Sequence, residues 1–463
     1  MGKLSIKIKD EDIKDVAYVK KMMEYSAMMP GFIERLQENT RKTLDEIGIP
    51  LDEREVSFLP NTQTPEGNVQ MHAAFPGTAA EKYADFMQQK VMSRDEIKEM
   101  CVPENPYMKK WRNRQVNRCK IEIGAGSIGF VHTPLSFEMA DGCSVGCEFC
   151  GLNAGKLKSV FRHTDENTAL FRDILKISRE IIGYAAGSGT MYFATEPLDN
   201  PDYELFLKDY REILEENPQI TTARAMMHVD RLKNLLKDVN KDKGIIYRFS
   251  VLSLDMLNEI YEAFTPEELL LVELLPQFSE APSNHFTKVG KKGEEVEEYE
   301  STISCISGFV VNMARKDVRL TTPCTADKDH PTGEIILEKG TFTDAESYKE
   351  LILGMIKRHM MNLISPKDKL KLAKNVSYEV NEEESQLIID IKKEVKYIYN
   401  CGESIKLFKV LFDKLNEKEY TKRELVAELR KDENFNSFTP ESIHFTINRF
   451  WNGGYIRIVG DKV

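Results

Sequence analysis

From Leu135 onward, short apolar segments alternate with amphipathic segments about six times along the chain. The strand candidates span residues 135–140, 190–196, 220–226, 244–253, 269–278 and 318–323. Helical periodicity marks segments between them, including residues 167–185, 202–216 and 301–316. Because neighbouring parallel strands need crossover connections, this alternation predicts a parallel sheet. The predicted fold class is α/β, a partial (β/α)6 barrel with its chemistry at the carboxyl ends of the strands.

Other sequence patterns flank this barrel, and the 463-residue length allows about three structural units. The predicted divisions are an N-terminal helical region (1–125), the partial barrel (126–345), a helical connector (346–402) and a winged-helix-like domain (403–463). In the last domain, one helix covers 404–415, the capping-box pattern Thr421-x-x-Glu424 opens a second, and Thr439-Pro440 opens a third. Three helices followed by a turn and a strand are typical of winged helices.

Charge and hydropathy exclude several classes of protein. The chain carries 64 Lys and Arg against 75 Asp and Glu, a formal charge of −11, which argues against a nucleic-acid-coating protein. No apolar run approaches the roughly 20 residues that span a bilayer, and the N-terminus lacks the apolar core of a secretory signal. We therefore expect a cytoplasmic protein without membrane contact, whose eight cysteines are ligands, redox groups or buried apolar residues.

Three of the cysteines have ligand spacing. Cys143, Cys147 and Cys150 stand in the segment MADGCSVGCEFCG, directly after the first predicted strand. Thiolates select zinc or iron–sulfur clusters, and three thiolates leave one iron of a [4Fe–4S] cluster without a protein ligand. S-adenosylmethionine (SAM) can chelate that iron, and an electron from the reduced cluster cleaves it to a 5′-deoxyadenosyl radical. The spacing resembles that of radical SAM enzymes; the alternative is a zinc site completed by a distant residue.

Four further residues are candidates for holding SAM. Phe149, inside the cysteine motif, can shield the cluster and approach the adenine. By resemblance to the superfamily, Glu196 at the end of the second strand accepts a hydrogen bond from the SAM amino group, although both glycines usual at this position are replaced. Alternation puts Arg248 and Ser250 on one face of the fourth strand, where they can meet the SAM carboxylate and ribose. The structural alternatives are a helix cap for Glu196 and an edge cap for Arg248.

Longer segments carry a narrower resemblance. They are residues 129–151 (GFVHTPLSFEMADGCSVGCEFCG), 192–204 (YFATEPLDNPDYE), 307–324 (SGFVVNMARKDVRLTTPC) and 340–346 (GTFTDAE). From about residue 29 to 345 the chain resembles radical SAM peptide epimerases that mature ribosomally made peptides of the proteusin kind. The resemblance implies inversion of L-residues to D-residues: the adenosyl radical removes a Cα hydrogen, and a cysteine thiol returns one from the opposite face.

The resemblance also implies a thiol donor and two partners. Cys324, which ends the predicted sixth strand, is the first candidate for the donor, and Cys305 is the second. The partners are a precursor peptide with a leader sequence and a flavodoxin- or ferredoxin-type electron donor. Either the winged-helix-like domain or the N-terminal helices can hold the leader.

Alternative reactions stay open at this point. They are peptide cross-linking or methylation by the same radical chemistry, and, in a different class, an iron–sulfur DNA-binding regulator. The five other cysteines include no pair at CxxC spacing, which argues against an auxiliary cluster.

Overall fold

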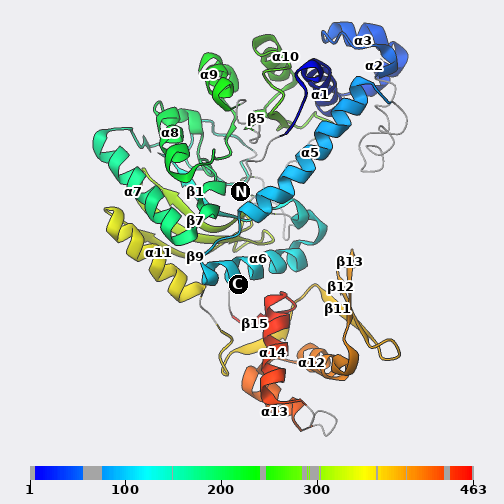
Figure 1. The fold of residues 1–463 in the computed structure, drawn as a ribbon, viewed down its shortest axis with the longest axis vertical. Helices are drawn as coiled ribbons and strands as arrows, with labels where there is room; N and C mark the ends of the chain where they lie inside the picture. Colours follow the sequence, from blue (N-terminus) through cyan, green and yellow to red (C-terminus); the bar gives the residue numbers. More distant parts are fainter. Residues whose placement is uncertain are drawn as a thin grey trace.

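A computed structural model describes residues 6–55, 76–148, 150–239, 247–283, 289, 291, 302, 304–360, 363–392, 394–431 and 438–460. Two apolar cores organise these residues. The larger core runs from Ile6 to Met360, and the smaller gathers residues 364–456 together with Ile121. Figure 1 shows the corresponding division into a large α/β body and a C-terminal module below it, with α6 between them. The N-terminal helices share the core of the sheet.

The N-terminal region is helical, as predicted, over the described residues. Its elements are η1 (Asp10–Asp12), α1 (Ile13–Met28), α2 (Phe32–Glu38), α3 (Thr40–Glu46), η2 (Glu53–Glu55), α5 (Ala79–Met100), α6 (Pro106–Ile123) and η4 (Gly124–Gly129). Asn105 caps α6 with Pro106 in its first turn, and Gly124 ends it with φ +77°. Helix α5 packs on α1 and crosses the amino ends of the strands, where it closes a cavity described below.

The body contains an open, mixed sheet, and its described strands do not close a barrel. They are β1 (Thr133–Glu138), β4 (Thr221–Thr222), β5 (Tyr247–Val251), β6 (Val272–Pro276), β7 (Ile306–Asn312), β8 (Asp317–Pro323) and β9 (Glu334–Thr341). Parallel pairs join β4 to β5 and β5 to β6, and parallel bridges at Thr190 link this part to β1. On its other side β1 pairs in parallel with β7, and β8 and β9 follow antiparallel.

Helices cover the outer face of this sheet. They are α7 (Asp165–Ile182), η5 (Tyr184–Ser188), η6 (Pro197–Asp199), α8 (Tyr203–Leu214), η7 (Ala225–Met227), α9 (Val229–Val239), α10 (Leu254–Ala263) and α11 (Ala345–His359). Phe137 of β1 meets Phe171 of α7 edge to face, with ring centroids 5.3 Å apart. The odd residues of β1 therefore pack against helices, which leaves Ser136 and Glu138 for the inner face.

Three sequence predictions for the sheet were wrong. Residues 190–196 contribute a single bridge at Thr190 instead of a strand. Residues 301–316, predicted as a helix, contain β7, whose seven residues are all buried and form a continuous, mostly apolar run. Gly308 permits the close pairing, because a Cβ there would lie 2.0 Å from the Pro134 carbonyl oxygen. The strand at 318–323 exists as β8, but it runs antiparallel to β7 and is not a sixth parallel strand.

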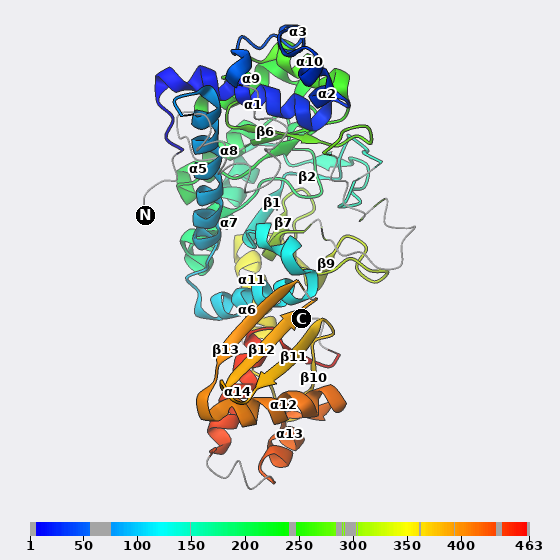
Figure 2. The same cartoon turned by 90° about the vertical axis from the view of Figure 1, so that its right-hand side faces the viewer.

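The C-terminal module combines strands and helices. Its elements are β10 (Lys369–Leu372), β11 (Val376–Asn381), β12 (Gln386–Ile391), β13 (Val395–Asn400), η9 (Gly402–Ser404), α12 (Ile405–Glu417), β14 (Tyr420–Thr421), α13 (Lys422–Leu429), α14 (Pro440–Asn452) and β15 (Ile456–Ile458). One sheet has the order β14-β10-β15, and a separate antiparallel sheet has the order β11-β12-β13. In Figure 2 the second sheet stands beside α6.

The connector prediction was wrong beyond α11, because residues 369–400 form four strands. The predicted helix starts were correct: Thr421 forms a capping box with Glu424, and Thr439 caps α14 with Pro440 in its first turn. The terminal strand β15 pairs with β10, which precedes the predicted winged-helix-like domain. None of the helices in the described part of the chain has the length and apolarity needed to cross a membrane.

Candidate functional site

The three motif cysteines lie on one loop at the carboxyl end of β1. The short strand β2 (Ala140–Asp141) pairs antiparallel with β3 (Ser159–Val160), so the chain between them folds back on itself. Within this cysteine loop, residues 142–158, the Cys143 N–H donates to the Gly155 carbonyl at 2.9 Å. The predicted position at the carboxyl edge of the sheet is confirmed for this loop.

Two glycines give the loop its path. Gly142 has φ +89°, and a Cβ there would lie 2.2 Å from the Lys156 carbonyl oxygen. Any side chain would therefore collide with the returning strand. Gly146, with φ +70°, has open space around the position of a Cβ. The first glycine permits a close backbone approach, and the second permits a left-handed turn between Cys143 and Cys147.

The thiols are half-buried and interact electrostatically. Burial raises the pKa of the Cys147 thiol to about 11, and the neighbouring Cys150 and Cys143 raise it further. Among the described residues, no three His, Cys, Asp or Glu side chains stand close enough together to hold a metal ion, the three loop cysteines included. The three thiols still fit a thiolate-bound cluster. They lie on one loop whose backbone path depends on Gly142 and Gly146, and their sulfurs are near enough for the thiolates to repel one another. A bound cation stabilises such thiolates and draws the ligands together.

Two polar side chains from outside the loop hold it in place. The Asp199 carboxylate accepts hydrogen bonds from the Ser144 backbone N–H, at 2.9 Å, and from the Ser144 hydroxyl. Lys291 Nζ donates to the Cys147 carbonyl at 3.1 Å, and the Lys291 N–H donates to the Cys150 carbonyl at 3.1 Å. Sequence reasoning missed both residues. Asp199 lies three residues after Glu196, so its closeness in sequence to that candidate could have indicated it. No local sequence pattern marks Lys291.

Glu196 stands close to this anchor, at the N-terminal cap of the η6 turn that carries Asp199. Its carboxylate accepts hydrogen bonds from the Thr222 hydroxyl at 2.7 Å, the Ala223 N–H at 2.9 Å and the Leu198 N–H at 3.1 Å. Burial raises the pKa of this carboxyl group. Three protein donors leave the carboxylate only limited remaining acceptor capacity, so its predicted contact with SAM stays a prediction.

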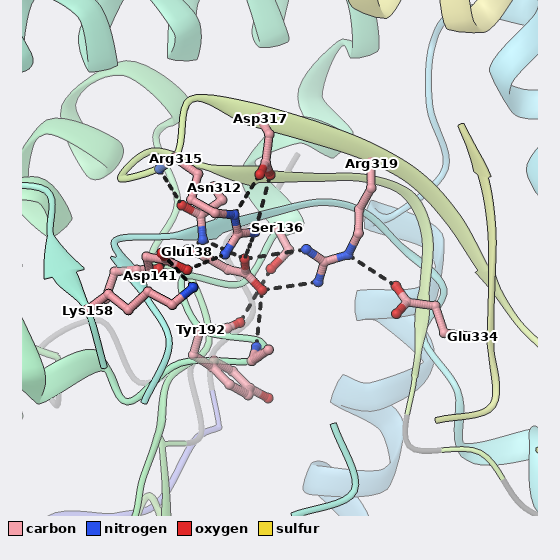
Figure 3. A network of polar contacts seen from close by, with 12 residues as sticks. Ser136, Glu138, Asp141, Lys158, Tyr192, Asn312, Arg315, Asp317, Arg319 and Glu334 are labelled. Carbon is pink, nitrogen blue, oxygen red and sulfur yellow. Dashed lines mark hydrogen bonds and ion pairs between the residues drawn. The ribbon is translucent and has the colours of Figure 1, made fainter. Parts of the chain in front are cut away.

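Figure 3 shows a polar network centred on Glu138, at the carboxyl end of β1. This carboxylate is 1% exposed and accepts hydrogen bonds from Arg319 at 3.1 Å, Asn312 at 2.9 Å and the Ala194 N–H at 3.1 Å. These groups outweigh the effect of burial and lower the pKa of Glu138, so it is charged. Glu138 ties β1, β7 and β8 together directly beneath the cysteine loop. With Asp199 and Lys291, it is a third residue that the sequence pattern did not reveal.

A second feature lies at the opposite, amino end of the same strands. Arg248 donates from Nε to Glu273 at 2.8 Å, and Lys90 of α5 contacts the other oxygen of Glu273 at 3.0 Å. These cations lower the pKa of Glu273 to about 2, although burial opposes them. The three side chains line a cavity of about 420 Å³ enclosed by α5 and the strand starts, the amino-end cavity. Ser250 shares the half-buried face of β5 with Arg248, as the alternation predicted.

Cys305 also lines the amino-end cavity, whereas Cys324 does not. Cys305 is half-buried; burial raises the pKa of its thiol and the nearby Arg248 lowers it. Cys324 follows β8, and because β8 runs antiparallel, this thiol lies at the amino edge instead of the predicted carboxyl rim. It is 2% exposed, beside Arg118, which donates to the carbonyl of Pro323. The geometric reason for ranking Cys324 first was therefore wrong.

The structure thus separates the predicted residues into two groups. The cysteine loop and Glu196 meet at the carboxyl end, while Arg248 and Cys305 meet at the amino end. The six residues of β1 between these ends span about 20 Å. Phe149, the remaining candidate, lies outside the described residues.

Comparison with known proteins gives limited information on activity. No protein-family model matches the sequence. The crystal structure of BtrN in complex with AdoMet and 2-DOIA aligns with 40% of this chain and 71% of its own, at 16% identity and a TM-score of 0.29, which is too low to support an argument. The uncharacterized protein y4wI of Sinorhizobium fredii is 31% identical over 385 residues, which cover 80% of this chain and 75% of the relative. By that extent of identity, the chain belongs to the same protein family as y4wI.

Proposed function

We propose that this protein is a radical SAM enzyme whose [4Fe–4S] cluster is held by Cys143, Cys147 and Cys150. The observation that carries the proposal is the loop of three neighbouring thiols at the carboxyl end of β1. When bound, such a cluster with SAM at its open iron supplies one-electron cleavage of the cofactor. A zinc site would need a fourth ligand, whereas the loop itself supplies three thiols.

The chain's own residues have distinct roles in this proposal. Asp199 and Lys291 fix the loop backbone, so that the three sulfurs need little reorganisation on binding. The Glu138–Arg319 pair holds the strand ends beneath the loop and excludes water there, because both side chains are nearly buried. Glu196 is the proposed acceptor for the SAM amino group. Arg248 lies too near the amino end for direct contact with a loop-bound cofactor, and we assign it to the cavity that contains Cys305.

We further propose that the substrate is a ribosomally made peptide and that the reaction inverts residues from L to D. The resemblance of residues 129–151, 192–204 and 307–324 to peptide epimerases supports this reaction. Inversion requires hydrogen to leave one face of the Cα and return to the other. Both candidate thiols lie at the amino end of the strands, about 20 Å from the cysteine loop, and neither faces a cofactor held at the loop. Cys305 lines a cavity, whereas Cys324 is buried. Cys305 therefore replaces Cys324 as the first candidate.

Co-expression with the small open reading frames that adjoin the gene identifies the peptide. The test is its reaction with the reconstituted protein in D₂O, followed by acid hydrolysis in H₂O and chiral amino-acid analysis. We expect D-residues that carry one deuterium each, with no other mass change. A loss of two hydrogens would indicate cross-linking, and a gain of 14 mass units would indicate methylation; either result would reject epimerisation while keeping the radical chemistry.

The donor assignment is tested in the same assay with two variants. Cys305→Ala should cleave SAM but yield no D-residues, whereas Cys324→Ala should invert residues like the wild type if it folds. The opposite pattern would restore Cys324 as the donor. Specific, salt-sensitive DNA binding without SAM cleavage would instead favour the regulator alternative.

A further inference from the structure

A groove separates α6 from the C-terminal module. One of its walls is a stripe of α6 that includes Lys109, Arg112, Val116 and Lys120, spaced for one face of a helix. The other wall is the inner face of β12 and β13, where Ile391, Val395, Tyr397 and Tyr399 point toward α6. Cavities of about 630 and 320 Å³ share Lys120, Ile391 and Tyr397, so they form one continuous depression, the basic groove.

The basic groove continues to the amino-end cavity. Phe130 and Val131, which precede β1, line both the 630 Å³ part of the groove and the cavity that contains Cys305. Ile128, in the same segment, is 63% exposed beside this junction. An extended chain lying in the groove can therefore lead directly to the cavity without crossing the cysteine loop.

The charge of the groove is opposite to that of the whole protein. Its lining includes Lys98, Lys109, Arg112, Lys120 and Arg449 but only one carboxylate, Glu99, whereas the chain has a formal charge of −11. Arg112 donates hydrogen bonds to the carbonyl oxygens of His132, Val131 and Lys98, and Glu99 is the acidic side chain that interacts with its charge. Among the described residues, no ion pair joins Lys109, Lys120 or Arg449 to an acidic side chain. The groove thus favours an acidic ligand.

The sheet beside the groove offers an open edge. Strand β13 pairs with β12, and no other described strand joins its second edge. Helix α12 lies on the same face of this sheet as Tyr397, because its Phe412 meets Tyr378 of β11, but its main contacts are with β11 and β12 and not with the β13 edge. Six residues of β13 span about 20 Å and leave every second backbone N–H and C=O directed away from β12. Such an edge can bind an extended peptide as an added strand.

We propose that the basic groove binds an extended, acidic segment of the peptide substrate as a strand along β13 and directs the following residues past Phe130 into the amino-end cavity. This inference rests on the proposed function, in which the substrate is a peptide. It adds where that peptide binds and which charge its bound segment carries. Tyr397 and Tyr399 supply apolar contact for every second residue of the added strand, and Lys109 and Lys120 pair with its carboxylates. Binding there raises the effective concentration of the downstream residues at the cavity.

The binding step can be tested without any reaction. The probes are two fluorescein-labelled ten-residue peptides, one alternating Glu and Val and one alternating Lys and Val, measured by anisotropy with the full-length protein. We expect only the acidic peptide to bind, with an affinity that falls as salt rises. Lys120→Glu should weaken it about tenfold, while Lys406→Glu, an exposed lysine of α12 outside the groove, should leave it unchanged.

Hydrogen exchange locates the bound peptide. Saturating acidic peptide should protect amides of residues 395–400 and leave those of the opposite edge, 376–381, unaffected. Equal binding of both peptides, unchanged affinity in Lys120→Glu, or protection away from β13 would overturn the inference. Peptide binding needs neither the cluster nor SAM, so this test can succeed even if the radical proposal fails. Conversely, radical chemistry without peptide binding at β13 would reject this inference alone.

Discussion

The buried Glu138–Arg319 pair offers a sharp test of the site's architecture. In Arg319→Met, Glu138 keeps Asn312, the Ala194 N–H and Arg315, whose Nη2 lies 3.6 Å away, but loses the partner whose Nη2 lies 3.1 Å from its carboxylate. At an effective dielectric constant of about 20, two charges at that distance of 3.1 Å attract by about 5 kcal/mol. The variant no longer has to desolvate the guanidinium on folding, which offsets part of the lost attraction. We therefore expect a net loss of about 3 kcal/mol in the free energy of unfolding at neutral pH.

The loss of unfolding free energy in Arg319→Met should be larger at high pH than at low pH. In the wild type the pKa of Glu138 lies below its ordinary value of 4.5, so its contribution is present above that pH and is lost on acidification. Without Arg319, burial is less opposed and raises the pKa of Glu138 relative to the wild type. Protonation then relieves the less fully compensated charge of Glu138, and the deficit of the variant should shrink between pH 8 and pH 5.

The two tryptophans allow the body to be observed alone. Trp111 lies in the larger core and Trp451 in the smaller one. Urea unfolding followed by fluorescence in a Trp451→Phe background therefore reports on the core next to Glu138. Lys158→Met is the matched control, because Lys158 is 73% exposed and its contact with Asp141 is worth about 0.5 kcal/mol or less. A deficit for Arg319→Met below about 1 kcal/mol, or one that is equal at both pH values, would refute the reasoning.

Three further predictions concern the loop and the module. Cys143→Ser should abolish the visible absorbance of the iron-reconstituted protein, whereas Cys401→Ser, far along the chain, should retain it; retention in both would exclude the proposed ligand set. Asp199→Asn should speed loss of iron to a chelator by about tenfold. Asp202→Asn should not, because the contacts of Asp202 with Arg162 and the His163 N–H lie outside the cysteine loop; equal rates would remove Asp199 as the loop anchor. Thr421→Ala should destabilise the C-terminal module by about 1 kcal/mol, because the capping box is lost. The fluorescence of Trp451 in a Trp111→Phe background measures this; no change would show that the cap contributes nothing.

The sequence by itself determined the local features of this protein. The spacing of the three cysteines predicted the loop, because the type and spacing of the ligands are encoded within a few residues. Capping at Thr421 and Thr439 located two helix starts, and alternation on β5 put Arg248 and Ser250 on one face. These properties depend on neighbours along the chain.

Only the tertiary structure decided which strands pair and in which direction. Residues 306–312 satisfy helical and extended patterns alike, and burial on both faces together with pairing to β1 and β8 along the two edges made them a strand. The antiparallel turn into β8 then moved Cys324 to the amino edge and left Cys305 beside Arg248. Asp199, Lys291 and the partners of Glu138 likewise meet only after folding, because the contacts they make join residues far apart in sequence. Strand direction and such long-range contacts are global properties of packing, which a local sequence pattern does not contain.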